Sequence, residues 1–191
     1  MKRQAITLGR VGILLPIAII IPFLGSLAGL AAMILLVLSH YYFSKFYEQP
    51  VIFKNALIGT VIQVAGNIIG SIIMVMAVGS ALFSFSGDGG VDYTNYQEIA
   101  SLLFDSGLTI FGTIIILAGL IVGFYFVYRA LVSLAEKTGV KLFKTAGLLY
   151  FIGAIGIIVF FLGFLVMFAA WIIHVVAYFS IQYENEQTAQ N

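Results

Sequence analysis

The sequence predicts an all-α integral membrane protein, a helical bundle with about six membrane segments. Hydrophobic residues make up 62% of the 191 residues, and the mean hydropathy is +1.12. Charged residues make up only 9%, whereas a soluble domain typically carries ~25%. The net charge is +1, so there is no excess of positive charge to bind a polyanion. These values exclude an ordinary soluble enzyme, a nucleic-acid-binding protein and a disordered chain.

Two of the long apolar stretches are expected to form helical hairpins. A single span needs about 20 residues, and the stretches at 11–43 and 145–181 are longer than that. Turn-forming residues lie inside both, at Pro22–Gly25 and near Gly163. We therefore expect two tight helical hairpins flanking a pair of long helices. The six expected segments are 5–21, 23–44, 52–84, 106–137, 141–160 and 162–182.

The basic residues predict the orientation of these segments. With six segments and Met1 inside, all nine lysines and arginines fall on the cytoplasmic side. With four segments, the same residues are divided between the two sides. Hairpins that re-enter the membrane without crossing it satisfy the rule equally well. We therefore expect a single transmembrane domain, 1–191, in the cell membrane, with both termini cytoplasmic.

The expected outer loop covers residues 86–105. Within it, Thr94–Gln97 fits a capping box, so we expect a short amphipathic helix that starts near Tyr96. The helix at 106–137 is expected to stop at Gly139 as its C′ residue. The tail at 184–191 is polar and is expected to fray.

Few polar residues lie at membrane depth, and most of them are on the third segment. Three share one helix face through their i, i+4, i+8 spacing: Gln63, Asn67 and Ser71. Four glycines are spaced for close helix packing: Gly66 and Gly70 on this segment, Gly119 and Gly123 on the next. The favoured interpretation is an interface between these two helices, joined by amide side chains. The functional alternative is a narrow polar path or a ligand site.

The two histidines, His40 and His174, fall toward the cytoplasmic ends of two expected helices. Two histidines at similar depth could ligate one haem, but no spacing motif supports this, and interfacial or hydrogen-bonded histidines are favoured. The chain has no cysteine and no carboxylate close in sequence to either histidine, so we expect no metal site, no cofactor and no catalytic residues. Tyrosines near the expected cytoplasmic ends suggest an interfacial belt: Tyr41, Tyr42, Tyr47, Tyr125, Tyr128, Tyr178 and Tyr183.

The junction between the fourth and fifth segments carries the sequences YRAL (128–131) and LAEKTGVKLFKTAG (134–147). Together with residues 52–57 and the Gly/Pro hairpin near the start, they give the chain a resemblance to a family of small multi-pass membrane proteins. That family is mainly archaeal and of unknown function, so the resemblance implies the architecture and no activity. Four basic residues at this junction are expected to anchor it to anionic headgroups: Arg129, Lys137, Lys141 and Lys144. Docking of a cytoplasmic partner is the alternative.

Three functional hypotheses follow from the sequence. The first is a non-enzymatic accessory, scaffold or assembly subunit that works in the lipid bilayer as a homo-oligomer or with other membrane proteins. The second is a small-solute or ion transporter or channel that uses the polar face of the third segment. The third is a haem-binding electron-transfer subunit that uses the two histidines.

Overall fold

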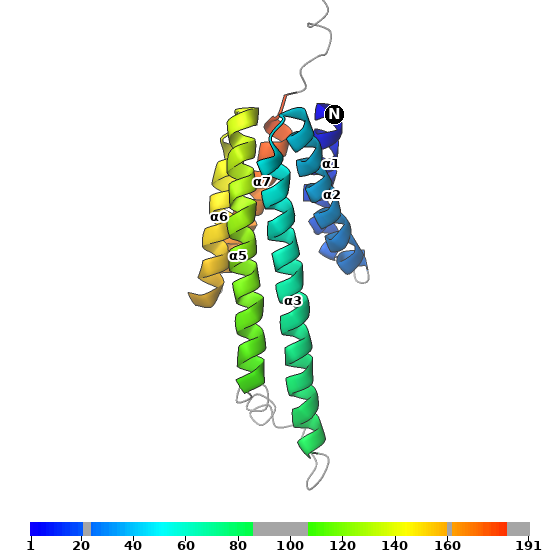
Figure 1. Ribbon diagram of the computed structural model, residues 1–191, viewed down its shortest axis with the longest axis vertical. Helices are drawn as coiled ribbons and strands as arrows, with labels where there is room; N and C mark the ends of the chain where they lie inside the picture. Colours follow the sequence, from blue (N-terminus) through cyan, green and yellow to red (C-terminus); the bar gives the residue numbers. More distant parts are fainter. Residues whose placement is uncertain (21–23, 86–106, 160–161, 183–191) are drawn as a thin grey trace, which may run out of the picture. The chain divides into compact units, whose positions relative to one another are not determined.

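The computed structural model describes residues 1–20, 24–85, 107–159 and 162–182. This part of the chain contains six α-helices, two short 3₁₀ helices and no strand (Figure 1). The elements are α1 (Lys2–Leu14), η1 (Leu15–Ile20), α2 (Leu24–Phe46), α3 (Pro50–Phe85), α5 (Gly107–Thr138), α6 (Leu142–Gly156), η2 (Ile157–Val159) and α7 (Leu162–Ser180). The predicted outer loop with its short helix, and the tail at 184–191, lie outside the described residues.

The predicted all-α membrane fold is confirmed, because each of the six expected segments corresponds to an α-helix. Among the described residues, four helices are long and apolar enough to cross a bilayer: Leu27–Phe46, Pro50–Gly79, Gly107–Thr138 and Leu162–Ser180. The other two, α1 and α6, are shorter, but each continues into a 3₁₀ helix. From the rise per residue, Lys2–Ile20 extends about 31 Å and Leu142–Val159 about 28 Å, close to the ~30 Å hydrocarbon core.

The breaks within the two helix pairs can be related to individual residues. Pro16 has no N–H to bond the carbonyl four residues back, and its ring clashes with that carbonyl, which explains why α1 gives way to η1. The second helices of the pairs start at Leu24 and Leu162, which are 138 residues apart and begin the same Leu-Gly dipeptide. Of the expected turn residues, Gly25 and Gly163 lie in the first turns of α2 and α7, and Pro22 lies outside the described residues.

The chain divides into two compact units, residues 1–60 with 124–191, and residues 61–123. In the first unit, α1 packs against α2, α6 packs against α7, and α1 also contacts α7. Large, fully buried side chains come from all six helices of this unit: Ile6, Phe43, Ile52, Leu131, Leu134, Phe143 and Tyr178. This core holds the α1–α2 pair and the α6–α7 pair together.

Two left-handed residues end helices of the first unit. At the end of α2, the Gln49 N–H donates to the Ser44 carbonyl at 2.9 Å across Glu48, whose φ is 52°. A hydrogen bond from an N–H to the carbonyl five residues earlier, across a left-handed residue, is characteristic of a Schellman cap. Gly139 has a φ of 74°, and its N–H donates to the Ala135 carbonyl at 2.9 Å. The prediction of Gly139 as the C′ residue is confirmed.

The second unit is a close pair formed by the described parts of α3 and α5 in 61–123. A Cβ atom added to Gly66 would lie 2.9 Å from the Gly119 Cα, and the reverse distance is also 2.9 Å. A Cβ atom added to Gly70 would lie 2.6 Å from the Gly112 carbonyl oxygen. The two backbones therefore meet directly, as in membrane helix pairs that pack through small residues.

Candidate functional site

Polar side chains from α2 and α7 meet in the core of the first unit. The Ser39 hydroxyl donates to the Ala5 carbonyl at 2.7 Å and lies 3.3 Å from the Tyr178 hydroxyl. Because a serine has a single O–H donor and a carbonyl only accepts, the Tyr178 O–H donates to Ser39. The Tyr178 ring packs so closely over Gly9 that a Cβ atom there would overlap it. Tyr178 therefore joins α1, α2 and α7, and the prediction that it belongs to an interfacial belt is wrong.

His174 lies one helical turn before Tyr178 and is almost completely buried. Its ring stacks on Tyr178 with centroids 5.1 Å apart and an interplanar angle of 24°. It also meets Phe143 and Tyr150 edge-on, each with centroids 5.8 Å apart. Neither ring nitrogen has a hydrogen-bond partner among the described residues. An unpaired buried polar group is costly, so this imidazole needs an explanation.

His40 is buried next to Ser39, and its protonation can be deduced from its one contact. Its Nδ1 lies 2.7 Å from the Leu36 carbonyl oxygen, one turn earlier on α2. Since a carbonyl oxygen only accepts, Nδ1 carries the proton, and Nε2 of the neutral ring holds a lone pair. That Nε2 atom is buried and has no partner within the described part of the chain. Both histidines thus lie inside the first unit, 5% and 4% exposed.

Arg10 holds the C-terminal end of α7. Its Nε donates to the Tyr178 carbonyl at 3.2 Å, and its Nη2 donates to the carbonyls of Phe179 at 3.4 Å and Ile181 at 3.3 Å. The last carbonyls of a helix have no partners within the helix, and the negative end of the helix dipole attracts a cation. From the sequence, Arg10 was expected only to be one of the basic residues on the cytoplasmic side. Its position within an otherwise apolar hairpin was the available signal for a structural role.

Replacing Arg10 with glutamine is expected to lower the free energy of unfolding by about 2 kcal/mol, because hydrogen bonds to a charged group are stronger than neutral ones. Thermal unfolding in mild detergent measures the effect. Arg3→Gln is the matched control, since Arg3 is exposed on the same helix. Equal melting temperatures for the two variants would show that Arg10 does not stabilise α7.

Four chain segments that were predicted to be cytoplasmic meet at one end of the first unit. A groove of about 460 Å³ lies between these segments. The residues that line it are Lys2, Phe46, Tyr47, Lys137, Thr138, Gly139, Val140, Ser180, Ile181 and Gln182. The groove brings together the start of α1, the α2–α3 turn, the α5–α6 turn and the end of α7.

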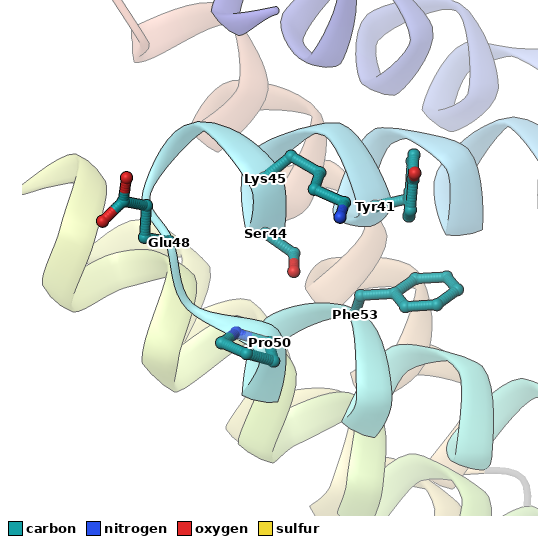
Figure 2. A pocket seen from close by; sticks show the side chains of 6 residues that line it. All are labelled: Tyr41, Ser44, Lys45, Glu48, Pro50 and Phe53. Atoms are coloured by element: carbon teal, nitrogen blue, oxygen red, sulfur yellow. The ribbon is translucent and has the colours of Figure 1, made fainter.

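A second groove, of about 430 Å³, lies beside the α2–α3 turn (Figure 2). The Tyr41 ring meets the Phe53 ring edge-on with centroids 5.2 Å apart, and Lys45 Nζ lies 5.7 Å from the centre of the Tyr41 ring. Figure 2 shows the Ser44 side chain pointing between the end of α2 and the start of α3, and the Lys45 side chain running along α2 toward Tyr41. Aromatic rings with a lysine beside them are typical of the membrane–water boundary.

The predicted anchor residues surround the α5–α6 junction and are all exposed: Arg129, Lys137, Lys141 and Lys144. Lys137 lies in the last turn of α5, and Lys141 is the N-cap residue of α6. Their exposure leaves them available to headgroups, and the anchoring role stays a prediction.

On α3, the predicted polar face and the glycines point in different directions. Asn67 and Ser71 are exposed, whereas Gly66 and Gly70 are buried against α5. Asn67 Nδ2 donates to the Gln63 carbonyl at 2.9 Å, within its own helix. Gln63 is partly buried, and its Nε2 has no partner among the described residues. Gly123 on α5 is buried as well. The close contact in the second unit is thus made by glycines.

The helices define a polytopic helical membrane protein. The chain belongs to the family described as "Protein of unknown function (DUF996)", which matches residues 27–172. It is also similar to the uncharacterized protein MJ1644 of Methanocaldococcus jannaschii, with 31% identity over 157 residues, 82% of this chain and 81% of that protein. No solved structure matches. The predicted resemblance to an archaeal family of unknown function is confirmed.

Proposed function

We propose that this protein is a non-enzymatic scaffold or assembly subunit of the cell membrane that pairs with a second copy of itself. The pairing surface is the polar face of α3, defined by Gln63, Asn67 and Ser71. The observation that carries the proposal is the exposure of Asn67 in a helix that is apolar enough to span a bilayer.

The surroundings of Asn67 are those of a lipid-facing surface. Ile68 is 55% exposed, Ile72 49% and Val75 71%. In hydrocarbon, no water is present to satisfy a polar side chain. The bond from Asn67 Nδ2 to the Gln63 carbonyl uses one N–H. A carboxamide also has a second N–H and an acceptor oxygen, which need partners.

A second copy is the occupant whose chemistry fits this face best. A carboxamide carries both a donor and an acceptor, so two of them pair by reciprocal N–H···O bonds. A two-fold axis along the membrane normal places Asn67 of one copy at the same depth as Asn67 of the other. Ser71, one turn further along, is small enough for the two helices to approach closely.

Replacing Asn67 with leucine is expected to weaken dimer formation roughly tenfold, since one interhelical hydrogen bond in a membrane contributes about 1–2 kcal/mol. Sedimentation equilibrium in detergent measures the dissociation constant, and Asn67→Gln is expected to retain most of the affinity. Thr7→Leu is the control, because Thr7 is an exposed polar residue on α1. Equal weakening in both leucine variants would exclude the Asn67 face.

The absence of cysteine allows a direct second test. A Ser71→Cys variant is expected to form a disulfide-linked dimer in native membranes under mild oxidation. Ile114→Cys, at an exposed position on α5, is expected to remain monomeric on the same gel. Crosslinking of Ile114→Cys in place of Ser71→Cys would assign the contact to α5.

We also infer that both termini are cytoplasmic. The positive-inside rule favours this orientation, and the groove that joins Lys2, the two turns and Gln182 at one end of the first unit supports it. The basic residues near this end then face anionic headgroups.

A small-solute or ion transporter is the alternative function, and it depends on the same polar face. The buried Nε2 of Gln63, without a partner among the described residues, is the observation that favours it. The transporter alternative requires solute flux in liposomes that falls in Asn67→Leu while the fold is retained. Flux that is unchanged in Asn67→Leu would show that solute does not pass along the polar face of α3.

A further inference from the structure

The groove beside the α2–α3 turn contains a buried hydroxyl group without a partner. Ser44 is 8% exposed, and its side chain forms no hydrogen bond to a described residue. Figure 2 shows this side chain directed from the end of α2 toward the start of α3, and Ser44 is one of the residues that line the groove. Buried polar groups are normally hydrogen-bonded. The groove therefore offers an O–H donor to a ligand.

The charges around the groove favour an anion. Lys45 Nζ lies 5.7 Å from the centre of the Tyr41 ring and forms no ion pair with a described residue. Figure 2 shows the carboxylate of Glu48, which also lines the groove, directed away from Ser44 and Lys45. The start of α3 at Pro50 adds the positive end of a helix dipole, with no acidic residue in its first turn. An ammonium group, a hydroxyl and a helix N-terminus together suit a phosphate.

The rest of the groove is apolar, and it continues into apolar surface along both helices. The Tyr41 and Phe53 rings, one on each helix, meet edge-on. Leu38 precedes Tyr41 by three residues, lies on the same face of α2 and is 40% exposed. Leu57 follows Phe53 by four residues, lies on the same face of α3 and is 38% exposed. A hydrocarbon chain can lie along these leucines while a charged group occupies the groove.

We propose that this groove binds an anionic phospholipid through its phosphate. The phosphate accepts a hydrogen bond from the Ser44 hydroxyl and from the Lys45 ammonium group, and an acyl chain lies along the exposed leucines. The groove lies at the adjoining ends of two helices that are apolar enough to cross a bilayer, Leu27–Phe46 and Pro50–Gly79. Basic pockets at such helix ends bind lipid headgroups. A free phosphate ion would leave the apolar part of the groove empty. None of these residues belongs to the proposed pairing surface.

The test is lipid binding to the full chain in mild detergent. Native mass spectrometry during titration with phosphatidylglycerol gives the dissociation constant of the first bound lipid. Phosphatidylcholine is expected to bind more weakly, because its ammonium group cancels the phosphate charge. Lys45→Gln is expected to weaken phosphatidylglycerol binding roughly tenfold and Ser44→Ala roughly fivefold, since each removes a hydrogen bond to a charged group. Lys45→Arg, which keeps the charge, is expected to retain most of the affinity.

Lys141→Gln is the matched control, because Lys141 is an exposed lysine that does not line the groove, and it is expected to bind phosphatidylglycerol as the wild type does. Equal weakening in Lys45→Gln and Lys141→Gln would overturn the proposal, since the attraction would then be spread over the basic surface. Two further results would also overturn it: equal affinity for the two lipids, and displacement of the bound lipid by inorganic phosphate. If Ser44→Ala does not fold, the variants of the exposed Lys45 decide.

Discussion

Replacing Gly163 with alanine is expected to open the α6–α7 hairpin and to lower the free energy of unfolding by about 3 kcal/mol. A Cβ atom at this position would lie 2.5 Å from the Gly153 carbonyl oxygen and 2.6 Å from the Gly156 carbonyl carbon. It would lie even closer to the Ile157 amide nitrogen. All three are backbone atoms, which cannot rotate away as a side chain does, so the two helices must separate.

The matched control for this prediction is Gly29→Ala. A Cβ atom at Gly29 meets nothing within 4 Å, and Gly29 also lies inside an α-helix. Alanine favours a helix over glycine by about 1 kcal/mol, so Gly29→Ala is expected to be as stable as the wild type or more stable. Thermal unfolding in detergent compares the two variants. If Gly163→Ala melts at or above the temperature of Gly29→Ala, the backbones of α6 and α7 do not approach each other closely at Gly163.

The hairpin shows how much of the fold the sequence could predict. Segment length, Pro22–Gly25 and Gly163 were enough to divide two long apolar stretches, because a bilayer limits the length of a span. The helix stop at Gly139 could also be predicted, since its left-handed conformation suits glycine. These features depend on residues close together in the chain.

The contacts that build the candidate site could not be predicted in the same way. Arg10 binds the carbonyl of Tyr178, 168 residues away, and the Trp171 indole N–H donates to the Ile13 carbonyl at 2.8 Å. Tyr178 resembled an interfacial tyrosine because it lies near a helix end, but the missing side chain of Gly9 leaves room for its ring. Only tertiary packing decides that Tyr178 is buried.

The polar face of α3 could be predicted from the sequence in part. Helical spacing places Gln63, Asn67 and Ser71 on one side of α3, but spacing does not say which neighbour that side meets. Glycine has no side chain, so Gly66 and Gly119 allow contact between backbones, and this contact fixes how α3 meets α5 in the second unit. Of the two amides beside this contact, Asn67 is exposed and Gln63 is partly buried.

Replacing Gly70 with valine is the second change for which we expect a large effect, again about 3 kcal/mol. A Cβ atom there would lie 2.6 Å from the Gly112 carbonyl oxygen and would overlap Ile116 Cγ1. Ile116 can change rotamer, but the carbonyl belongs to the α5 backbone and cannot. We therefore expect α3 and α5 to move apart within the second unit.

A cysteine pair reports this separation directly, because the chain has no native cysteine. Thr113 Oγ1 lies 3.9 Å from Met74 Sδ, so Met74→Cys with Thr113→Cys is expected to form a disulfide readily. Adding Gly70→Val should slow that reaction roughly tenfold, in line with a loss of more than 1.4 kcal/mol of helix pairing. Adding Gly79→Val should leave the rate unchanged, because a Cβ atom at Gly79 meets nothing within 4 Å. Equal rates with the two valines would mean that close glycine packing does not hold this helix pair together.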